Sequence, residues 1–223
     1  MDFRDSPDEA AFRERLRGWL AEQKGRFPTS GDAYWAKAGE WHQALYAAGF
    51  FGTSWPEKYG GQDLPPVYDV IVDEEIAKAG APARPSLGYL VVGLSHHGNE
   101  ELRQRFLPGM IDGTERWCQG FSEPGAGSDL ASLRSTARRD DERGGWVLNG
   151  QKTWSSRAAL AHWGFGLFRS DPQAQKHAGL TYFLFPLDAE GITVRPIAQL
   201  DGEAGFAEIF FEDVFVPDAD VLG

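Results

Sequence analysis

At the centre of the sequence stands Trp117-Cys118-Gln119-Gly120-Phe121-Ser122-Glu123-Pro124-Gly125-Ala126-Gly127-Ser128-Asp129. This segment begins as a short apolar run typical of a strand and continues into a glycine-rich turn. Gly125 and Gly127 lack a Cβ atom, so their backbone can adopt positive φ and approach a ligand closely. The N–H groups of such a turn, together with the Ser128 hydroxyl, favour an anion such as phosphate.

A Gly-x-Gly turn alone indicates only a tight turn with a capping Ser-Asp pair. Two further features make this one more specific. Ser122-Glu123-Pro124 precede the turn, and Trp154-Ser155-Ser156 follow it later in the chain. The combination resembles the acyl-CoA dehydrogenase family. Residues 121–129 resemble its flavin-binding signature, and Asn149-Gly150-Gln151-Lys152-Thr153-Trp154-Ser155-Ser156 resembles its second flavin-contacting segment.

The resemblance extends over essentially the whole chain, in the same order, and it implies an activity. The family carries FAD and catalyses α,β-dehydrogenation of acyl-CoA thioesters. A carboxylate removes the α-proton while the β-hydride passes to a flavin nitrogen. Donors must polarise the thioester carbonyl, because the α-proton is otherwise too weakly acidic at neutral pH. The resemblance also implies lipid metabolism as the setting and electron-transfer flavoprotein as the electron acceptor.

The resemblance assigns roles residue by residue. Ser122 matches a hydrogen-bond donor to the isoalloxazine ring, and Ser128 matches a position near the flavin pyrophosphate and the bound thioester. Trp154 matches an aromatic that packs against the ring, and Ser156 a hydroxyl near the reactive nitrogen. Relatives often carry Thr where this chain has Ser122 and Ser156. The expected cofactor contacts are Gln119, Gly120, Phe121, Ser122, Gly127, Ser128, Trp154, Ser155 and Ser156, and Ser128 is also the expected substrate contact.

No residue of this chain is expected to be the catalytic base. Glu123 is a candidate by chemistry, but its place before Pro124 in the turn favours a structural role. In the family the base lies in a later four-helix bundle, which also carries part of the adenosine-binding surface and most of the subunit interface. We therefore expect that bundle to come from the rest of a longer protein or from another chain, in a homo- or hetero-oligomer.

Two other interpretations use the same residues. An acyl-CoA oxidase or a flavin monooxygenase could be built on this scaffold, and reactivity of the reduced protein with oxygen would distinguish them. A non-catalytic binding or scaffolding subunit could pair with a complete relative.

Composition excludes several other classes. The 223 residues are 42% hydrophobic and 25% charged, which is typical of a globular protein. The net charge of −11 and the absence of a Lys/Arg cluster argue against nucleic acid as a partner. No apolar run approaches the ~20 residues that span a bilayer, and the N-terminus has no basic-then-apolar signal pattern. Cys118 is the only cysteine, and no Cys/His spacing indicates a metal site. Cytosol is the expected compartment.

Periodicity divides the chain into helices followed by strands, which predicts an α+β fold. We expect an all-α helical domain over residues 1–112 and a β-barrel-like middle domain over residues 113–223. Ser6, Pro7 and Glu9 predict the start of the first helix through a capping box.

The same patterns make four local predictions. Residues 86–94 are apolar almost all round and predict a buried helix. Pro108 is expected to end the next helix. In the second half, Ser135–Arg138 and Gly145–Leu148 predict a hairpin, and Asn149-Gly150 predicts a second hairpin turn directly after it.

Overall fold

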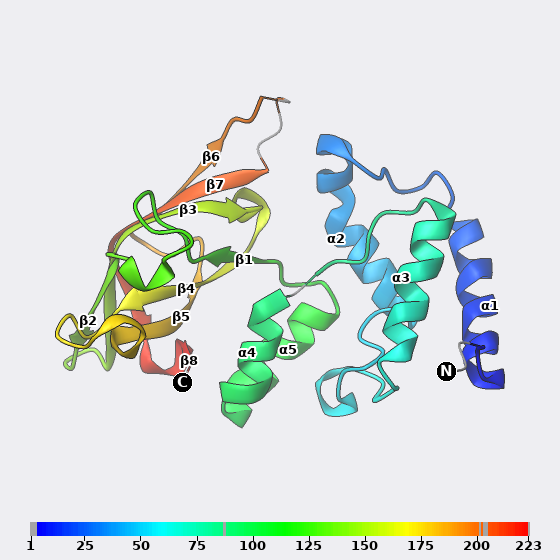
Figure 1. Ribbon diagram of the computed structural model, residues 1–223, viewed down its shortest axis with the longest axis horizontal. Helices are drawn as coiled ribbons and strands as arrows, with labels where there is room; N and C mark the ends of the chain where they lie inside the picture. Colours follow the sequence, from blue (N-terminus) through cyan, green and yellow to red (C-terminus); the bar gives the residue numbers. More distant parts are fainter. Residues whose placement is uncertain (1–3, 87, 201, 203–204, 223) are drawn as a thin grey trace. The chain divides into compact units, whose positions relative to one another are not determined.

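The computed structural model describes residues 4–86, 88–200, 202 and 205–222. Helices occupy the first half of the chain and strands the second (Figure 1), as the α+β prediction requires. The helices are α1 (Pro7–Glu22), α2 (Gly31–Ala47), α3 (Val67–Ala79), α4 (Gly88–His97) and α5 (Glu100–Ile111). The strands are β1 (Trp117–Gly120), β2 (Thr136–Asp140), β3 (Gly145–Ser156), β4 (Trp163–Arg169), β5 (Leu180–Pro186), β6 (Ile192–Ile197), β7 (Phe206–Pro217) and β8 (Val221–Leu222).

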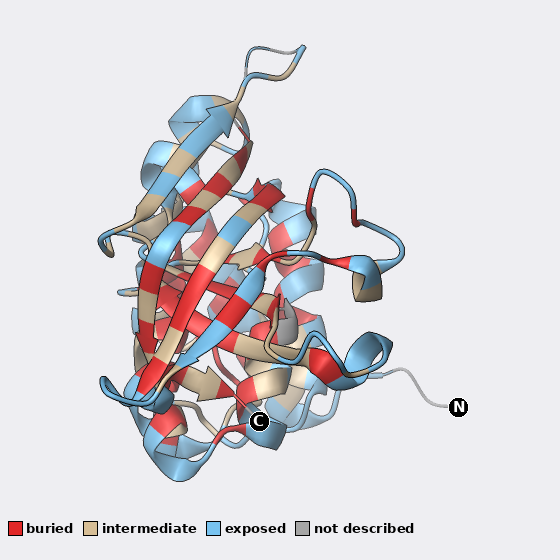
Figure 2. Ribbon diagram, turned by 90° about the vertical axis from the view of Figure 1, so that its left-hand side faces the viewer, coloured by how far each residue is buried: buried red, intermediate tan, exposed pale blue. Residues whose placement is uncertain are grey.

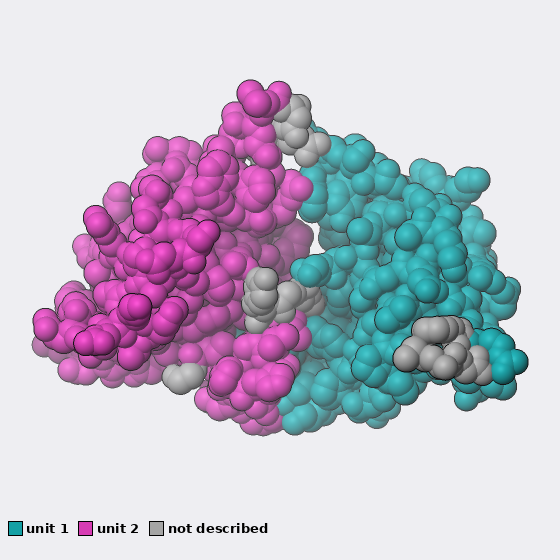
Figure 3. Space-filling model, viewed as in Figure 1, with its two compact units in different colours: residues 1–87, 104–114 teal, residues 88–103, 115–223 magenta. Residues whose placement is uncertain are grey.

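The chain forms two compact units (Figure 3). One contains residues 1–87 and 104–114, and the other contains residues 88–103 and 115–223. α4 and the first residues of α5 therefore belong to the second unit, and the last change of unit along the chain lies between residues 114 and 115. The predicted domain boundary between residues 112 and 113 stays a prediction, because a division into compact units does not test where a domain begins.

The start of α1 follows from its first residues. Glu9 N–H donates to Ser6 Oγ at 3.3 Å, and Ser6 N–H donates to Glu9 Oε2 at 2.7 Å. This reciprocal pair is the predicted capping box, with Pro7 at the first helical position. Helical spacing then places Phe12, Leu16 and Leu20 on one buried face.

An aromatic core holds the helical unit together. The ring centroids of Phe12 and Phe50 lie 5.4 Å apart, edge to face, and Trp19 stacks on Trp41 at 5.6 Å. The core consists of Phe12, Leu16, Leu20, Phe27, Trp41, Leu45, Phe50, Phe51, Ile71, Val72, Ile76 and Ile111. Segments from α1, α2 and α3 therefore share one hydrophobic core.

The second unit is organised by one mixed sheet. Its strand order is β6-β7-β3-β2-β4-β5-β8, with β1 pairing in parallel to β4. The ends of that order are not paired with each other in the described residues, so the predicted word "barrel-like" fits only loosely. Buried positions alternate with more exposed ones along β7 (Figure 2), as expected of a sheet with one face on a core. The β2–β3 hairpin is confirmed, from the pair Thr136/Asn149 to the pair Asp140/Gly145.

The predicted hairpin turn at Asn149-Gly150 is wrong. β3 runs through it as one strand of 12 residues and pairs with β7 on both sides of it. Asn149 donates its side-chain amide to Asp213 Oδ1 at 2.9 Å and accepts from Asp213 N–H at 3.0 Å. Gly150 adopts φ +140°, and the register shifts there. The Asn-Gly pair therefore makes an irregularity within a strand, because cross-strand bonds to β7 outweigh the local turn preference.

Two helix predictions are also corrected. Pro108 does not end its helix, because α5 continues to Ile111, where burial of Met110 and Ile111 offsets the hydrogen bond that proline cannot make. α4 is not buried all round, since Leu90 and Leu94 are buried but Val92 is 59% exposed. Leu87 lies outside the described residues.

Candidate functional site

The structure brings the two predicted flavin segments together within the second unit. Thr153 N–H, near the end of β3, donates to the carbonyl of Ser122 at 2.9 Å. Ser122 lies two residues after the end of β1, and Trp154 follows Thr153. The hydrogen bond therefore places the predicted ring donor beside the predicted ring-packing aromatic, although the sequence separates them widely.

Trp154 has an unusual backbone and an exposed side chain. Its φ is +57°, in the left-handed region that a bulky residue rarely occupies, at a cost of about 1–3 kcal/mol. The β3–β7 register shifts between Lys152 and Ser155, so the strand is bulged at this position. The indole is 59% exposed and meets the ring of Phe206 edge to face at 5.9 Å. The bulge therefore presents a large apolar surface outward.

Ser122 supplies an unused donor beside this aromatic surface. Its carbonyl is engaged by Thr153, but within the described part of the chain its N–H has no hydrogen-bond acceptor. Unpaired backbone N–H groups that are not fully solvated are uncommon in folded proteins. Ser122 is half-buried, so its N–H and hydroxyl suit a polar ligand edge.

The other predicted contacts differ in accessibility. Ser128 and Ser156 are exposed, whereas Gly120 is buried and Phe121 packs against Phe165 at a centroid distance of 5.7 Å. The hydroxyl of Ser155 is buried and lacks a hydrogen-bond partner in the described residues. Ser155 as a whole is 0% exposed, so this unit presents none of it to a ligand at its surface. Gln119 is half-buried at the centre of β1.

The glycine turn is closed by backbone hydrogen bonds. Glu123 N–H donates to Ala126 O at 2.8 Å, and Ala126 N–H donates to Glu123 O at 3.1 Å. Neither Gly125 nor Gly127 uses the positive φ that a glycine can adopt, so the turn does not depend on it. A Cβ atom at either position would meet no other atom within 4 Å. Because neither glycine has a side chain, the outer surface of the turn has room for a bulky ligand group.

Beneath the turn lies a buried ion pair. Lys152 is fully buried, and its Nζ lies 2.8 Å from Glu123 Oε1 and 2.7 Å from the carbonyl of Leu167. The Glu123 carboxylate also accepts from the N–H groups of Arg134 at 2.6 Å and Ser135 at 2.9 Å. Burial works to raise the pKa of Glu123, but the hydrogen bond from Lys152 and the backbone donors outweigh it and lower the pKa. Glu123 is therefore a structural carboxylate, in agreement with its expected role.

Lys152 is the residue that the sequence reasoning missed. It stands among the residues that carry the family resemblance, but a lysine in a strand normally indicates an exposed position. Its Nζ also lies 4.7 Å from the centroid of the Phe168 ring. Simple alternation along β3 does not reveal it, because Gly150 and Trp154, two residues to either side, are exposed and the strand is bulged.

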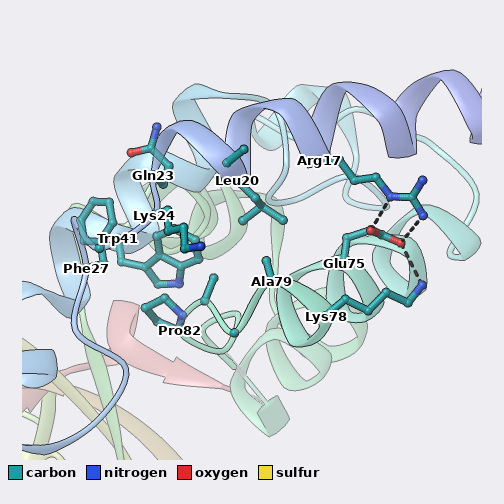
Figure 4. Close-up of a pocket in the computed structure, with 14 residues that line it drawn as sticks. Arg17, Leu20, Gln23, Lys24, Phe27, Trp41, Glu75, Lys78, Ala79 and Pro82 are labelled. Carbon is teal, nitrogen blue, oxygen red and sulfur yellow. Dashed lines mark hydrogen bonds and ion pairs between the residues drawn. The ribbon is translucent and has the colours of Figure 1, made fainter.

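Hollows occur in both units. One of about 320 Å³ lies beside the turn and is lined in part by Pro124, Arg134 and Gln151. A larger one, of about 630 Å³, lies wholly in the helical unit between aromatic and charged side chains (Figure 4). There Arg17 and Lys78 flank Glu75. None of the predicted site residues lines the larger hollow.

The described residues lack two kinds of feature. No group of three or more His, Cys, Asp or Glu side chains there could hold a metal ion. No helix in that part of the chain is both long and apolar enough to cross a membrane.

The chemistry of this donor set fits a flavin. A flavin requires hydrogen-bond donors at its ring edge, an aromatic or apolar face, and an anion site for its phosphates. Ser122 offers donors and Trp154 offers an exposed face. The turn at Gly127 and Ser128 offers open space with a hydroxyl.

Comparison with known proteins gives a consistent result. Residues 6–114 match the acyl-CoA dehydrogenase N-terminal domain, and residues 118–214 match the acyl-CoA dehydrogenase middle domain. The chain is 43% identical to the acyl-CoA dehydrogenase IpdE1 of Mycobacterium tuberculosis, over 96% of this chain and 58% of the relative.

Solved structures agree with the sequence matches. The steroid ACAD Tcur3481-Tcur3483 aligns with a TM-score of 0.83 at 30% identity, over 100% of this chain and 59% of that one. The ChsE4-ChsE5 complex from Mycobacterium tuberculosis aligns with a TM-score of 0.83 at 31% identity, over 100% of this chain and 58% of that one. The present chain thus spans somewhat more than half the length of these relatives. Members of this family are flavoproteins of lipid metabolism. From its two domain matches, its relatives and its fold, the chain belongs to the acyl-CoA dehydrogenase family.

Proposed function

We propose that this chain is the flavin- and substrate-binding portion of an FAD-dependent acyl-CoA dehydrogenase. The observation that carries the proposal is the juxtaposition of Ser122 and Trp154 through the Thr153 hydrogen bond. It brings an unused N–H donor and an exposed aromatic side chain together at one place on the surface. Bound FAD would supply the acceptor for the hydride that leaves the β-carbon of the thioester.

The residues of this chain would bind and orient rather than exchange protons. Ser122 would hydrogen-bond the edge of the flavin ring, and Trp154 would pack against the ring and shield it from water. Ser128, with the open turn around Gly127, would hold a phosphate or the pantetheine end of the substrate. Apart from the fully buried Ser155, the remaining predicted contacts, Gln119, Gly120, Phe121 and Ser156, would contribute mainly through backbone groups and the Ser156 hydroxyl. The base that removes the α-proton would come from outside these residues.

The names of the relatives favour a bulky acyl group and more than one type of subunit. One aligned structure is a steroid ACAD, and another is a complex of ChsE4 with ChsE5. We therefore propose a steroid-derived or similarly bulky acyl-CoA as the substrate. We also propose a hetero-oligomer in which this chain pairs with a second subunit, and electron-transfer flavoprotein as the acceptor.

The test is to purify the full-length protein that contains this sequence, with any subunit that accompanies it, and to identify the released cofactor by chromatography. We expect FAD. We also expect steroid-side-chain acyl-CoA thioesters to bleach the flavin anaerobically faster than straight-chain thioesters do. Release of FMN or a nicotinamide alone would refute the cofactor assignment. Rapid reoxidation of the reduced flavin by oxygen would favour an acyl-CoA oxidase or a flavin monooxygenase. FAD binding without bleaching by any thioester would favour a non-catalytic subunit.

A further inference from the structure

We propose that the buried Lys152–Glu123 pair is a positioning device that holds the flavin-facing turn in its binding geometry. The inference rests on the proposed function, because it concerns how this chain presents Ser122 and Ser128 to FAD. It goes further by assigning a role to two residues that touch neither cofactor nor substrate in that proposal.

The Glu123 carboxylate fixes both ends of the loop that carries Ser128. At one end, the backbone of Glu123 closes the tight turn with Ala126. At the other end, the N–H groups of Arg134 and Ser135 donate to the carboxylate, at 2.6 and 2.9 Å. One side chain therefore closes the loop from residue 123 to residue 135, and both of its oxygen atoms are engaged.

Lys152 connects that closed loop to the sheet. Its Nζ reaches Glu123 on the turn and the carbonyl of Leu167 on β4. At 3.5 Å, the long limit of a hydrogen bond, it also faces the carbonyl of Phe121. The next residue of β3, Thr153, binds the next carbonyl, that of Ser122. Two consecutive residues of β3 thus hold two consecutive carbonyls at the start of the turn.

The orientation of the Phe121–Ser122 peptide group follows from these contacts. In a planar trans peptide, the C=O and N–H bonds point in opposite directions. Because the Phe121 carbonyl faces the buried ammonium group, the Ser122 N–H must point away from it. This is the N–H without an acceptor in the described residues. The buried charge therefore accounts for an outward-facing donor at the proposed ring site.

A buried ion pair is a costly way to gain stability alone, since well-packed apolar residues often stabilise a core as well or better. Variants of the pair can therefore distinguish a positioning role, which affects FAD binding, from a purely structural role, which affects only stability. Lys152→Met and Glu123→Gln each leave one charge buried without its partner. The double variant Lys152→Met/Glu123→Gln removes both charges, so it relieves that penalty. It still lacks a donor to the Phe121 and Leu167 carbonyls and a full set of acceptors for the 134–135 amides.

The experiment uses the full-length protein with any accompanying subunit. Stability is measured as the thermal unfolding midpoint without cofactor. FAD binding is measured by fluorescence titration, and the visible spectrum of the bound flavin is recorded. We expect both single variants to lose stability and the double variant to recover most of it. FAD should nevertheless bind at least tenfold more weakly to the double variant than to the wild type, with a spectrum shifted toward that of free flavin. Arg139→Met, which removes the ion pair with Asp218 in the same unit, is the control and should leave FAD binding unchanged.

Wild-type affinity and spectrum in the double variant would overturn the proposal and leave the pair a purely structural role. If the double variant does not fold, the single Lys152→Met variant carries the comparison, because it removes the donor to the Phe121 and Leu167 carbonyls and leaves the Glu123 carboxylate on the amides of Arg134 and Ser135. In that case, a wild-type flavin spectrum in Lys152→Met would overturn the proposal. Failure of the proposed function would look different, because the wild-type protein itself would then not bind FAD.

Discussion

His42, in α2, is a buried imidazole with a single defined role. Its Nε2 donates to the carbonyl of Ile111 at 3.1 Å, and its ring lies 4.2 Å from that of Phe51. Gly113 is required beside it, because its φ is +77° and a Cβ there would lie 2.7 Å from the imidazole. Burial lowers the pKa of His42 from 6.5 to about 4, although the Ile111 carbonyl and Asp112 oppose the shift. The folded helical unit therefore requires the neutral imidazole.

We expect this residue to make the helical unit sensitive to mild acid. The folded state binds its proton more weakly than the unfolded state, so stability is complete above pH 6.5 and declines as the pH falls toward 4. From pH 7 to pH 5 the free energy of unfolding should fall by about 2 kcal/mol on account of His42. Urea titrations followed by tryptophan fluorescence should show that decline, and His42→Gln should flatten it. His177→Gln, at an exposed site, is the control and should leave it unchanged. An equal decline in wild type and His42→Gln would contradict this assignment.

Single residues also show where sequence reasoning reached its limit. The pattern identified Ser122, Ser128 and Trp154 as candidates because their types and spacing match a known signature. It gave no sign of the left-handed backbone at Trp154, since nothing in a local window reports a register shift against β7. Lys152 was missed for a related reason, because its acceptors lie on the turn and on β4, far from it in sequence.

At the scale of elements, one carboxylate joins α1 to α3. Glu75 is 3% exposed, and its oxygen atoms lie 2.7 Å from both Arg13 and Arg17 of α1. Lys78, one turn later on α3, lies 2.9 Å from it. The hydrogen bond from Arg17, followed by those from Lys78 and Arg13, lowers the pKa of Glu75 from 4.5 to about 2 against the effect of burial.

We expect Glu75→Gln to destabilise the helical unit by about 2–3 kcal/mol, since it removes the buried charge that pairs with both Arg13 and Arg17. Glu74→Gln is the matched control. The neighbouring Glu74 also contacts Arg13, at 2.8 Å, but it is 48% exposed and should contribute less than about 1 kcal/mol. Denaturant titrations of both variants at pH 7 make the comparison. Because the folded pKa is lowered, the difference between Glu75→Gln and wild type should shrink as the pH falls from 4.5 toward 2. Equal losses of unfolding free energy in the two variants would show that burial does not make Glu75 more important for stability than the exposed Glu74.

Elements were predicted well where local signals agreed with tertiary contacts. The capping box at Ser6 and Glu9 set the start of α1, and the β2–β3 hairpin followed from its turn residues. The predictions failed where tertiary contacts opposed a local preference. Pairing with β7 carried β3 through Asn149-Gly150, and burial of Met110 and Ile111 carried α5 past Pro108. Turn and breaker preferences of about 1–3 kcal/mol are small enough for such contacts to outweigh.

At the scale of the whole molecule, the described acidic groups show how binding and proton transfer are divided. A base for dehydrogenation must come within hydrogen-bond reach of the α-proton. Glu123, the acid nearest the predicted ring donors in sequence, is held by Lys152 and two backbone N–H groups with a lowered pKa. A carboxylate so engaged is a poor proton acceptor, and its burial keeps it from substrate. In the proposed function these residues therefore bind and orient, and the base is expected in a later bundle, as the family resemblance implies.

We accordingly expect the 223 residues alone to show no turnover. Anaerobic mixing with straight-chain, branched and steroid-derived acyl-CoA thioesters should not bleach added FAD, and FAD should bind weakly. The full-length protein, assayed alongside with any accompanying subunit, should bleach at a catalytic rate. The second unit exposes the large apolar side chains of Trp154 and Leu160. We therefore also expect the isolated chain to associate, which light scattering would detect. Bleaching by the 223 residues at the rate of the full-length protein would place the base within them. Asp129, exposed beside Ser128 in the turn, would then be the first residue to replace with Asn, because unlike Glu123 its side chain is accessible to substrate.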